Sequence, residues 1–217
     1  MESLDQIKSR IETAVAGAKI EIVQNGSPSH QDSLFIDNEH AVAIASFLRV
    51  DPALCFDFCS NVTGIDWLDR VVKKTTKLKQ FVDGQEKEVV ETTEEKTPGY
   101  LEAVYHLYSI THKHGPLIIR MRTTGRAEGA RLPSLTPIWR SAELQEREIF
   151  DLYGISFEGH PDLRRILMWD EFKDYPMRKD YREPDDYEWE PTAHDAVLEK
   201  AKAHYPSRPV EEELEPS

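Results

Sequence analysis

Cysteine is nearly absent from this sequence: among 217 residues only Cys55 and Cys59 occur, within the stretch CFDFC. An iron–sulfur cluster is normally held by four thiolates, so these two cannot hold one by themselves. If CFDFC is a strand, its two thiols lie on one face roughly 13 Å apart, too far for a disulfide. Both cysteines are therefore expected to be plain core residues, and any redox role must belong to a partner.

The sequence also has no apolar run near the roughly 20 residues of a membrane-spanning helix. Its start, MESLDQIKSR, lacks the basic beginning and apolar middle of a signal peptide, so a cytoplasmic protein is predicted. Basic residues are few: 27 Lys and Arg stand against 40 Asp and Glu, a net charge of −13. This balance argues against nucleic acid or an anionic membrane as the main partner, because both prefer a basic surface.

Helices and strands alternate in the first quarter of the chain. Apolar residues recur at helical spacing behind Ser3, a good N-cap, and Gly17 lies near the end of this helix. A second helix is predicted over 38–51 and is stopped by Pro52. Strands are predicted in the stretches KIEIVQ, LFID and ALCFDFCSNVTGIDWLD, the last with a turn near 61–64.

Residues 70–99 differ in composition from the rest, since Lys, Glu and Thr alternate around a central Asp83-Gly84. Asp-Gly between two alternating runs is the strongest short hairpin signal, so a protruding and mostly solvated β-ribbon is predicted. YLEAVYHLYSITHK and PLIIRMRTT predict a second hairpin, with its turn at HKHGP. Both of its strands are apolar enough to lie in the body of a sheet.

From Thr136 the pattern is helical, with Pro137 in the first turn and Gly154 where a left-handed C-terminal residue is wanted. Residues 174–217 carry 13 Asp and Glu against 6 Lys and Arg, a net charge of −7, together with six prolines. Such a tail cannot form a core of its own. It is expected to be poorly ordered alone and ordered on a partner, with a short helix near TAHDAVLEKAKAH.

A carboxylate falls inside the apolar stripe of the predicted helix 138–153. At about 100° per residue, Glu146 lies in the middle of the apolar arc. An unpaired, charged carboxylate at this position would strongly oppose folding, so Glu146 must be either paired or protonated. A cationic partner is expected: Arg120 and Arg122, which share one face of a strand, are favoured over Arg164 or Arg165. The polar side of the helix could be a solvated face of ion pairs made by Glu143, Arg147 and Asp151.

Two kinds of site chemistry are weak alternatives. Glu148 with His160 would be an acid–base pair, but no nucleophile motif, Gly-rich phosphate loop or metal spacing accompanies it. His106, His112 and His114 would project to one side of an unbroken strand, which is the pattern of a metal site. However, two of them lie at a predicted turn and no carboxylate accompanies them there.

EREIFDLYGISFEGHPDLRRILM at 146–168, followed by YPMRKDY at 175–181, resembles the signature of the 30 kDa subunit family of respiratory complex I, the NADH-quinone oxidoreductase. FDFCSNVTGIDW and YLEAVYHLYSIT look like two core-strand segments of that family, so the resemblance covers most of residues 1–182. Met177 stands where the family usually has Leu, a mild change of similar volume. The residues that carry the signature and are assigned to a partner interface are Glu146, Arg147, Glu148, Asp151, Gly154, Gly159, His160, Pro161, Arg164, Arg165, Pro176, Arg178, Lys179, Asp180 and Tyr181.

The resemblance implies a two-layer α+β fold, with a mixed sheet, a domain over 1–173 that contains the 70–99 ribbon, and an extended partner-binding tail over 174–217. It implies a non-catalytic, cofactor-free subunit, with no catalytic, cofactor-binding or metal-binding residue, while FMN and iron–sulfur clusters belong to partner subunits. The expected partner is the 49 kDa-type subunit, with neighbouring hydrophilic-arm subunits, at the cytoplasmic face of the bacterial inner membrane. Charges set among apolar residues suit such permanent docking onto a polar protein.

Two alternatives stay open. The chain could be the equivalent subunit of a membrane-bound hydrogenase or another dehydrogenase, because nothing in it contacts the electron donor. It could instead be a free-standing enzyme that uses Glu148 and His160.

Overall fold

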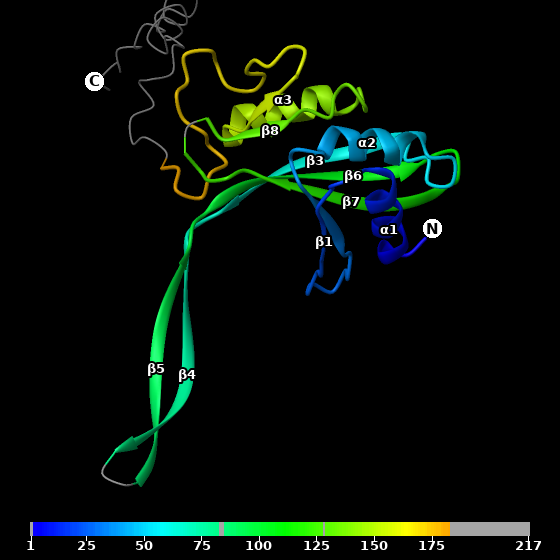
Figure 1. The fold of residues 1–217 in the computed structure, drawn as a ribbon. Helices are drawn as coiled ribbons and strands as arrows, with labels where there is room; N and C mark the ends of the chain where they lie inside the picture. The colour runs from blue at the N-terminus through cyan, green and yellow to red at the C-terminus, as the bar shows by residue number, and fades with distance from the viewer. Residues whose placement is uncertain (1, 83–84, 128, 183–217) are drawn as a thin grey trace, which may run out of the picture. The chain divides into compact units, whose positions relative to one another are not determined.

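Five strands form one mixed sheet in the computed structural model, which describes residues 2–82, 85–127 and 129–182 (Figure 1). β2 pairs with β7 in parallel, and the other three neighbouring pairs are antiparallel. In spatial order the strands are β1 (Ile20–Val23), β2 (Ser33–Ile36), β7 (His114–Arg122), β6 (Tyr100–Ser109) and β3 (Phe58–Trp67).

Three helices supply the second layer. Helix α1 (Leu4–Ala14) begins with a complete capping box, in which Ser3 accepts from the Gln6 N–H and the Gln6 side chain accepts from the Ser3 N–H. It packs against α2 (Ala41–Val50), β1 and β2. α2 and the third helix, α3 (Ala142–Tyr153), follow the same face of the sheet (Figure 1).

Strand alternation divides the sheet into two unlike faces. Leu34 of β2, Tyr105 of β6 and Ile119 of β7 are fully buried in the core together with Ile44 of α2 and Ile149 of α3. Their neighbours along each strand point to the other face, because successive strand residues alternate in direction. The predicted two-layer α+β fold is confirmed.

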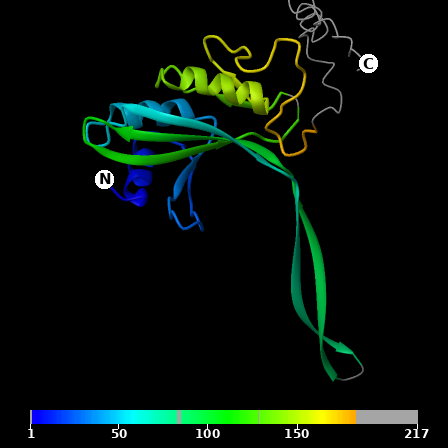
Figure 2. The ribbon, with the colours of Figure 1, turned by 180° about the vertical axis from the view of Figure 1, so that it is seen from behind.

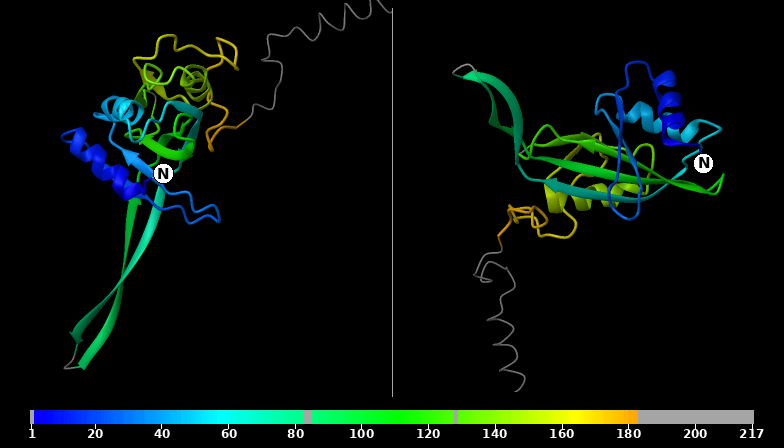
Figure 3. Two further views of the ribbon diagram at one scale, coloured as in Figure 1. Left: turned by 90° about the vertical axis from the view of Figure 1, so that its right-hand side faces the viewer. Right: turned by 90° about the horizontal axis from the view of Figure 1, so that it is seen from below.

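The 70–99 ribbon forms a hairpin of β4 (Arg70–Val82) and β5 (Gln85–Thr97), which pair antiparallel with each other and with no other strand of the described residues. The hairpin continues beyond the paired ends of β3 and β6 (Figures 2 and 3). Its Asp83-Gly84 turn lies outside the described residues. A last short sheet joins β8 (Arg131–Pro133) in parallel to β9 (Ser156–Glu158).

Three local predictions are wrong. β3 continues through 61–64 without a turn. CFDFC is a strand only at its end, where Phe58 and Cys59 begin β3: at 55–57 the chain bends, Cys55 has a positive φ of 44°, and its N–H donates to the Asp51 carbonyl. α3 begins at Ala142 rather than near Thr136, since residues 134–136 fold back to Glu146. In a continuous helix, Thr136 and Glu146 would be ten residues apart and therefore about 15 Å apart along the helix axis.

The compact part of the chain ends at Tyr181, and the segment from 183 onward, with the helix predicted near TAHDAVLEKAKAH, lies outside the described residues. Within the described residues, the helices fall short of the length and apolar character that crossing a membrane requires.

The hairpin should be dispensable for folding, because neither β4 nor β5 completes the five-stranded sheet. Replacing residues 71–96 with an Asn-Gly turn keeps Arg70 and Thr97 as the last pair and retains the hydrogen bond from the Gly99 N–H to Asp69 (2.6 Å). The variant should unfold in urea in one cooperative transition. A broad or absent transition would contradict this.

Candidate partner interface

The end of helix α3 meets a chain segment that returns from some twenty residues later. Gly154 ends the helix in the left-handed conformation, with φ of 75°. A Cβ at this position would lie 2.6 Å from the Tyr175 ring and 2.8 Å from the Arg178 guanidinium. Glycine is therefore needed twice here, for the backbone turn and for the close approach of 175–178.

Asp151 organises the coil that follows β9. Its carboxylate is fully buried and accepts from the backbone N–H groups of Ile166, Leu167 and Met168 at 3.0, 2.7 and 2.9 Å, and from Arg165 at 2.6 Å. Burial disfavours the charged form, but the four donors outweigh it, and the pKa of Asp151 is lowered. One carboxylate therefore fixes three successive peptide groups that belong to no helix or strand.

Arg147 and His160 hold the preceding part of the same coil. The buried Arg147 guanidinium donates to the carbonyls of Arg164 (3.2 Å) and Arg165 (3.3 Å). His160 Nδ1 accepts from the Asp162 N–H at 3.1 Å, so a neutral His160 donates from Nε2 to the Glu143 carbonyl at 2.9 Å. The interpretation of Arg147 and Asp151 as a solvated face is wrong, because the returning chain covers both.

A second buried carboxylate holds the end of the described chain. Asp66 of β3 accepts from Arg126 at 2.6 and 2.8 Å and from the Lys179 N–H at 2.8 Å. Arg126 also donates to Asp180 at 2.7 Å, and these partners raise its pKa. Arg178 donates to the Tyr153 carbonyl (2.7 Å) and the Arg126 carbonyl (3.1 Å). Tyr181 donates its N–H to the Arg178 carbonyl.

Glu146 is fully buried, as predicted, but its expected cationic partner is wrong. The carboxylate accepts from the hydroxyls of Tyr105 (3.0 Å), Ser134 (2.6 Å) and Thr136 (3.1 Å) and from the Leu135 N–H (2.9 Å). Burial raises its pKa, although these hydrogen bonds oppose the shift. Neutral donors take the place of a counter-ion.

The four candidate arginines bind other carboxylates. Arg120 and Arg122 lie on the face of β7 that points away from the helices, and both pair with the buried Glu102. Arg164 pairs with Asp162 and Arg165 with Asp151. The alternation of side chains along a strand explains why the arginine pairing was wrong. Tyr105 lies on the core face of the sheet, which faces α3, whereas residues 120 and 122 point to the other face.

The other signature residues lie around this coil. Glu148 and Pro161 are both exposed, whereas Pro176 is partly buried. Gly159 has a φ of 83°, in the region that favours glycine. His160 is engaged by Glu143 and Asp162, and within the described residues no hydrogen bond joins it to Glu148. The proposed acid–base pair is therefore not assembled in this structure.

The coil presents apolar side chains outward while its backbone is held from within. Ile166, Leu167 and Met177 are 37%, 59% and 54% exposed. Trp169 and Phe172 pack edge to face, with ring centroids 4.8 Å apart. The segment 159–181 therefore combines a fixed backbone with exposed apolar groups, a combination that suits a binding surface.

Two side-chain groups bear on metal binding. The His112 and His114 rings stack at 5.8 Å, but His112 Nε2 is engaged by the Pro52 carbonyl and His106 lies further along β6. Asp37, Glu39 and His40 lie close together, but Asp37 already accepts from the Lys19 N–H and from His40. In each group, at least one potential ligand atom already makes a hydrogen bond within the chain.

The family described as "Respiratory-chain NADH dehydrogenase, 30 Kd subunit" matches residues 34–187. The chain is 37% identical over 171 residues to an NADH-quinone oxidoreductase subunit of Rhizobium meliloti (strain 1021), covering 78% of this chain and 76% of that protein. It is 34% identical over 181 residues to an NADH-quinone oxidoreductase subunit of Coxiella burnetii (strain Dugway 5J108-111), covering 82% and 74%.

The fold also occurs in solved structures. A chain from the structure of the membrane-bound sulfane sulfur reductase (MBS), an archaeal respiratory membrane complex, matches with a TM-score of 0.54 and 17% identity. The match covers 99% of this chain and 100% of that one. At this identity the likeness concerns the fold alone.

Truncation of Glu146 should destabilise the fold more than truncation of Glu143, a neighbouring half-buried glutamate. Glu146→Ala leaves three hydroxyls and one N–H without their acceptor, at a cost of about 3 kcal/mol in the free energy of unfolding. Glu143→Ala should cost well under 1 kcal/mol, since the charged contact of its side chain within the described residues is a long ion pair with Arg140 (3.8 Å). Urea unfolding compares the two variants; equal costs would refute the role of Glu146.

Asp151 should make the fold sensitive to acid. Because its pKa is lowered on folding, the stabilisation is present above the ordinary carboxyl pKa and is lost as pH falls through the folded-state pKa. Asp151→Asn should cost about 3 kcal/mol at pH 7 by leaving Arg165 unpaired, and its stability should fall less steeply on acidification. Asp170→Asn, at an exposed position, is the matched control. Parallel pH profiles for the two variants would contradict this assignment.

Proposed function

The chain belongs to the 30 kDa subunit family of respiratory-chain NADH dehydrogenase, and on this basis we propose that it is a non-catalytic structural subunit of a proton-translocating NADH-quinone oxidoreductase. In this role it supports electron transfer from NADH, through FMN and iron–sulfur clusters of other subunits, to quinone. It docks in the hydrophilic arm, at the cytoplasmic face of the bacterial inner membrane.

The preformed coil 159–181 is the observation that carries this proposal. Ordering a coil on binding costs free energy. Because Asp151 and Asp66 already hold this coil in the free chain, much less free energy is lost when it binds a partner. Its exposed Leu167 and Met177 would then supply apolar area to a permanent interface. The proposed partner is the 49 kDa-type subunit, with neighbouring hydrophilic-arm subunits around it.

The state of the cysteines supports a chain without its own cofactor. Burial raises the pKa of Cys59 to about 12, and its thiol donates to the Asn61 carbonyl. An iron–sulfur cluster is normally held by four thiolates, and the sequence has only two cysteines. We therefore assign FMN and the iron–sulfur clusters to partner subunits.

The proposal can be tested by tagging the chain in its native host and purifying what assembles with it. The tagged complex should oxidise NADH with a quinone acceptor, and the chain purified alone should show neither this activity nor a visible chromophore. A complex that accepts electrons only from another donor would contradict the assignment to NADH. Activity of the chain alone would contradict the non-catalytic role.

Replacing Leu167 or Met177 should impair assembly without destabilising the chain. Leu167→Ser and Met177→Ser remove exposed apolar groups, so the unfolding transition should stay unchanged while recovery of the chain in the complex falls about tenfold. Ile110→Ser is the control, since Ile110 is similarly exposed (63%) in the turn between β6 and β7. Full assembly of both coil variants would place the interface elsewhere.

A further inference from the structure

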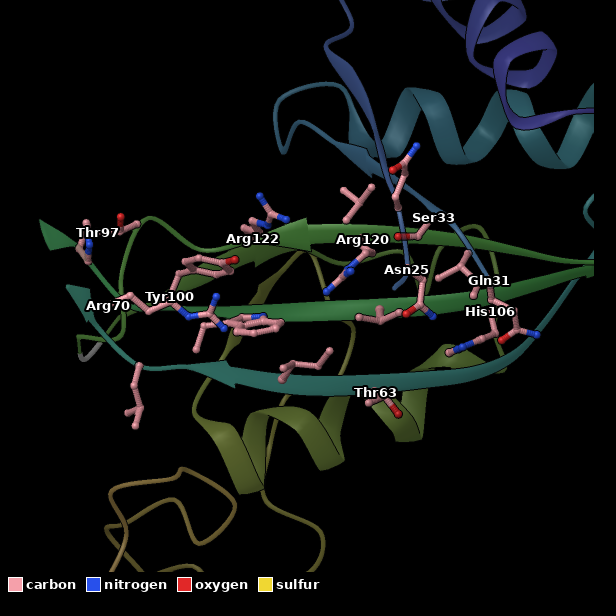
Figure 4. Close-up of a pocket in the computed structure, with 18 residues that line it drawn as sticks. Asn25, Gln31, Ser33, Thr63, Arg70, Thr97, Tyr100, His106, Arg120 and Arg122 are labelled. Carbon is pink, nitrogen blue, oxygen red and sulfur yellow. The ribbon is translucent and has the colours of Figure 1, made fainter. Parts of the chain in front are cut away.

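The sheet face that points away from the helices is lined by charged, aromatic and amide side chains. A hollow of about 750 Å³ lies over it, reaching from Trp67 and Tyr100 to His106. Figure 4 shows Arg70, Tyr100 and Arg122 toward one end of this hollow and His106 toward the other, with Arg120 between them. On β6 the hollow runs from residue 100 to residue 106, about 20 Å of extended chain.

Two arginines on this face share one carboxylate. Glu102 is fully buried and accepts from Arg120, from Arg122 Nε at 3.1 Å and from Trp67 Nε1 at 2.8 Å. Arg120 Nε is buried and has no hydrogen-bond acceptor among the described residues. The guanidinium groups therefore have more donors than the chain's own carboxylate can accept.

Aromatic rings hold these cations at the surface of the sheet. The Arg122 guanidinium lies 4.4 Å from the Phe35 ring and 5.1 Å from the Tyr100 ring, and Arg70 lies 4.9 Å from the Trp67 ring. Stacking engages the face of a guanidinium and leaves its N–H edge free for an oxygen acceptor. Arginine and aromatic residues together are also the residue types enriched in protein interfaces.

The charge of this face is opposite to that of the chain. Among the described residues, the hollow is lined by three arginines, Arg70, Arg120 and Arg122, and by no Asp or Glu; the charges of these arginines and of Glu102 beneath them sum to +2. The whole chain has a net charge of −13. A polyphosphate chain or an anionic membrane would be repelled by that excess, whereas a short acidic peptide segment needs only the local cations.

We propose that this open sheet face binds an extended acidic segment of a neighbouring polypeptide. Arg120 and Arg122 are two residues apart on one strand, which places them about 7 Å apart on one face. In an extended partner segment, carboxylates at positions i and i+2 have the same spacing. The segment recognised is therefore an Asp/Glu-x-Asp/Glu sequence lying along β6 and β7, with its apolar side chains over Val104 and Ile118.

The arginines of this surface lie apart from the exposed apolar groups of the coil 159–181. Leu167 and Met177 follow α3, on the helix side of the sheet, whereas Arg120 and Arg122 point to the opposite side. The partner is a neighbouring subunit only if the proposed function holds, so the inference rests on that function. Two chemically different surfaces would let one chain join two neighbours.

A photo-crosslinking residue tests both surfaces in the purified native complex. p-Benzoylphenylalanine in place of Thr63, which is exposed on the rim of the hollow, should crosslink to another subunit within six residues of an Asp/Glu-x-Asp/Glu sequence. The same residue in place of Leu167 reports the coil separately. Crosslinking at 167 but not at 63 would overturn only the present inference, and crosslinking at neither would overturn the proposed function as well.

A synthetic peptide of the crosslinked segment then tests the recognition chemistry by titration calorimetry against the full chain. Arg122→Gln should weaken binding about tenfold, and replacing both acidic residues of the peptide with Gln should weaken it at least as much. Arg131→Gln, at an exposed arginine on β8, should leave the binding unchanged.

Urea unfolding checks that Arg122→Gln still folds. If this variant does not fold, the binding of the Gln-substituted peptide to the unaltered chain tests the inference instead. A crosslink to a neutral or basic segment, a crosslink to a second copy of this chain, or equal binding of both peptides would overturn the inference.

Discussion

Burial of carboxylates is the constraint on which the rest of this structure depends. Asp66, Glu102, Glu146 and Asp151 are each at most 2% exposed, and a buried acid must be supplied with hydrogen-bond donors or it opposes folding. Each of the four obtains its donors from a different segment. Arg126 and the Lys179 N–H donate to Asp66, and Arg120 and Arg122 donate to Glu102. The hydroxyls and N–H of 134–136 donate to Glu146, and the 165–168 coil donates to Asp151. The positions of these segments are set by the acids that they satisfy.

This arrangement explains how a chain region without helix or strand can serve as a binding surface. Residues 159–181 bury few large apolar groups of their own, so the hydrophobic effect alone would hold them weakly. Asp151 supplies the missing constraint by accepting three successive peptide N–H groups, and Asp66 does the same for the Lys179 N–H. The apolar side chains of the coil can therefore remain exposed. Charge within an apolar sequence is thus used mainly inside the chain, to shape the surface that we propose docks onto a neighbouring protein.

The sequence predicted those features that depend on local patterns. Ser3 as a cap, the Asp83-Gly84 hairpin strands, the strands of the second hairpin and Gly154 at the end of α3 all follow from neighbouring residues, and each corresponds to an observed element. It also identified Glu146 as buried. Its partners could not be predicted, because Ser134, Thr136 and a backbone N–H carry no charge that would mark them. The pairing of Asp66 with Arg126 spans 60 residues, and its only signal is a carboxylate at an inward-facing strand position.

Asp151 orders the coil 159–181 in the free chain, before any partner binds. The most direct test is amide hydrogen exchange of Ile166, Leu167 and Met168 in the isolated chain. Since these three N–H groups donate to a buried carboxylate, their exchange should be slowed in the free chain almost as much as that of α3, and Asp151→Ala, which removes the acceptor, should remove the protection. Exchange at the rate of an unstructured peptide in the free chain, with protection only in the assembled complex, would contradict the account.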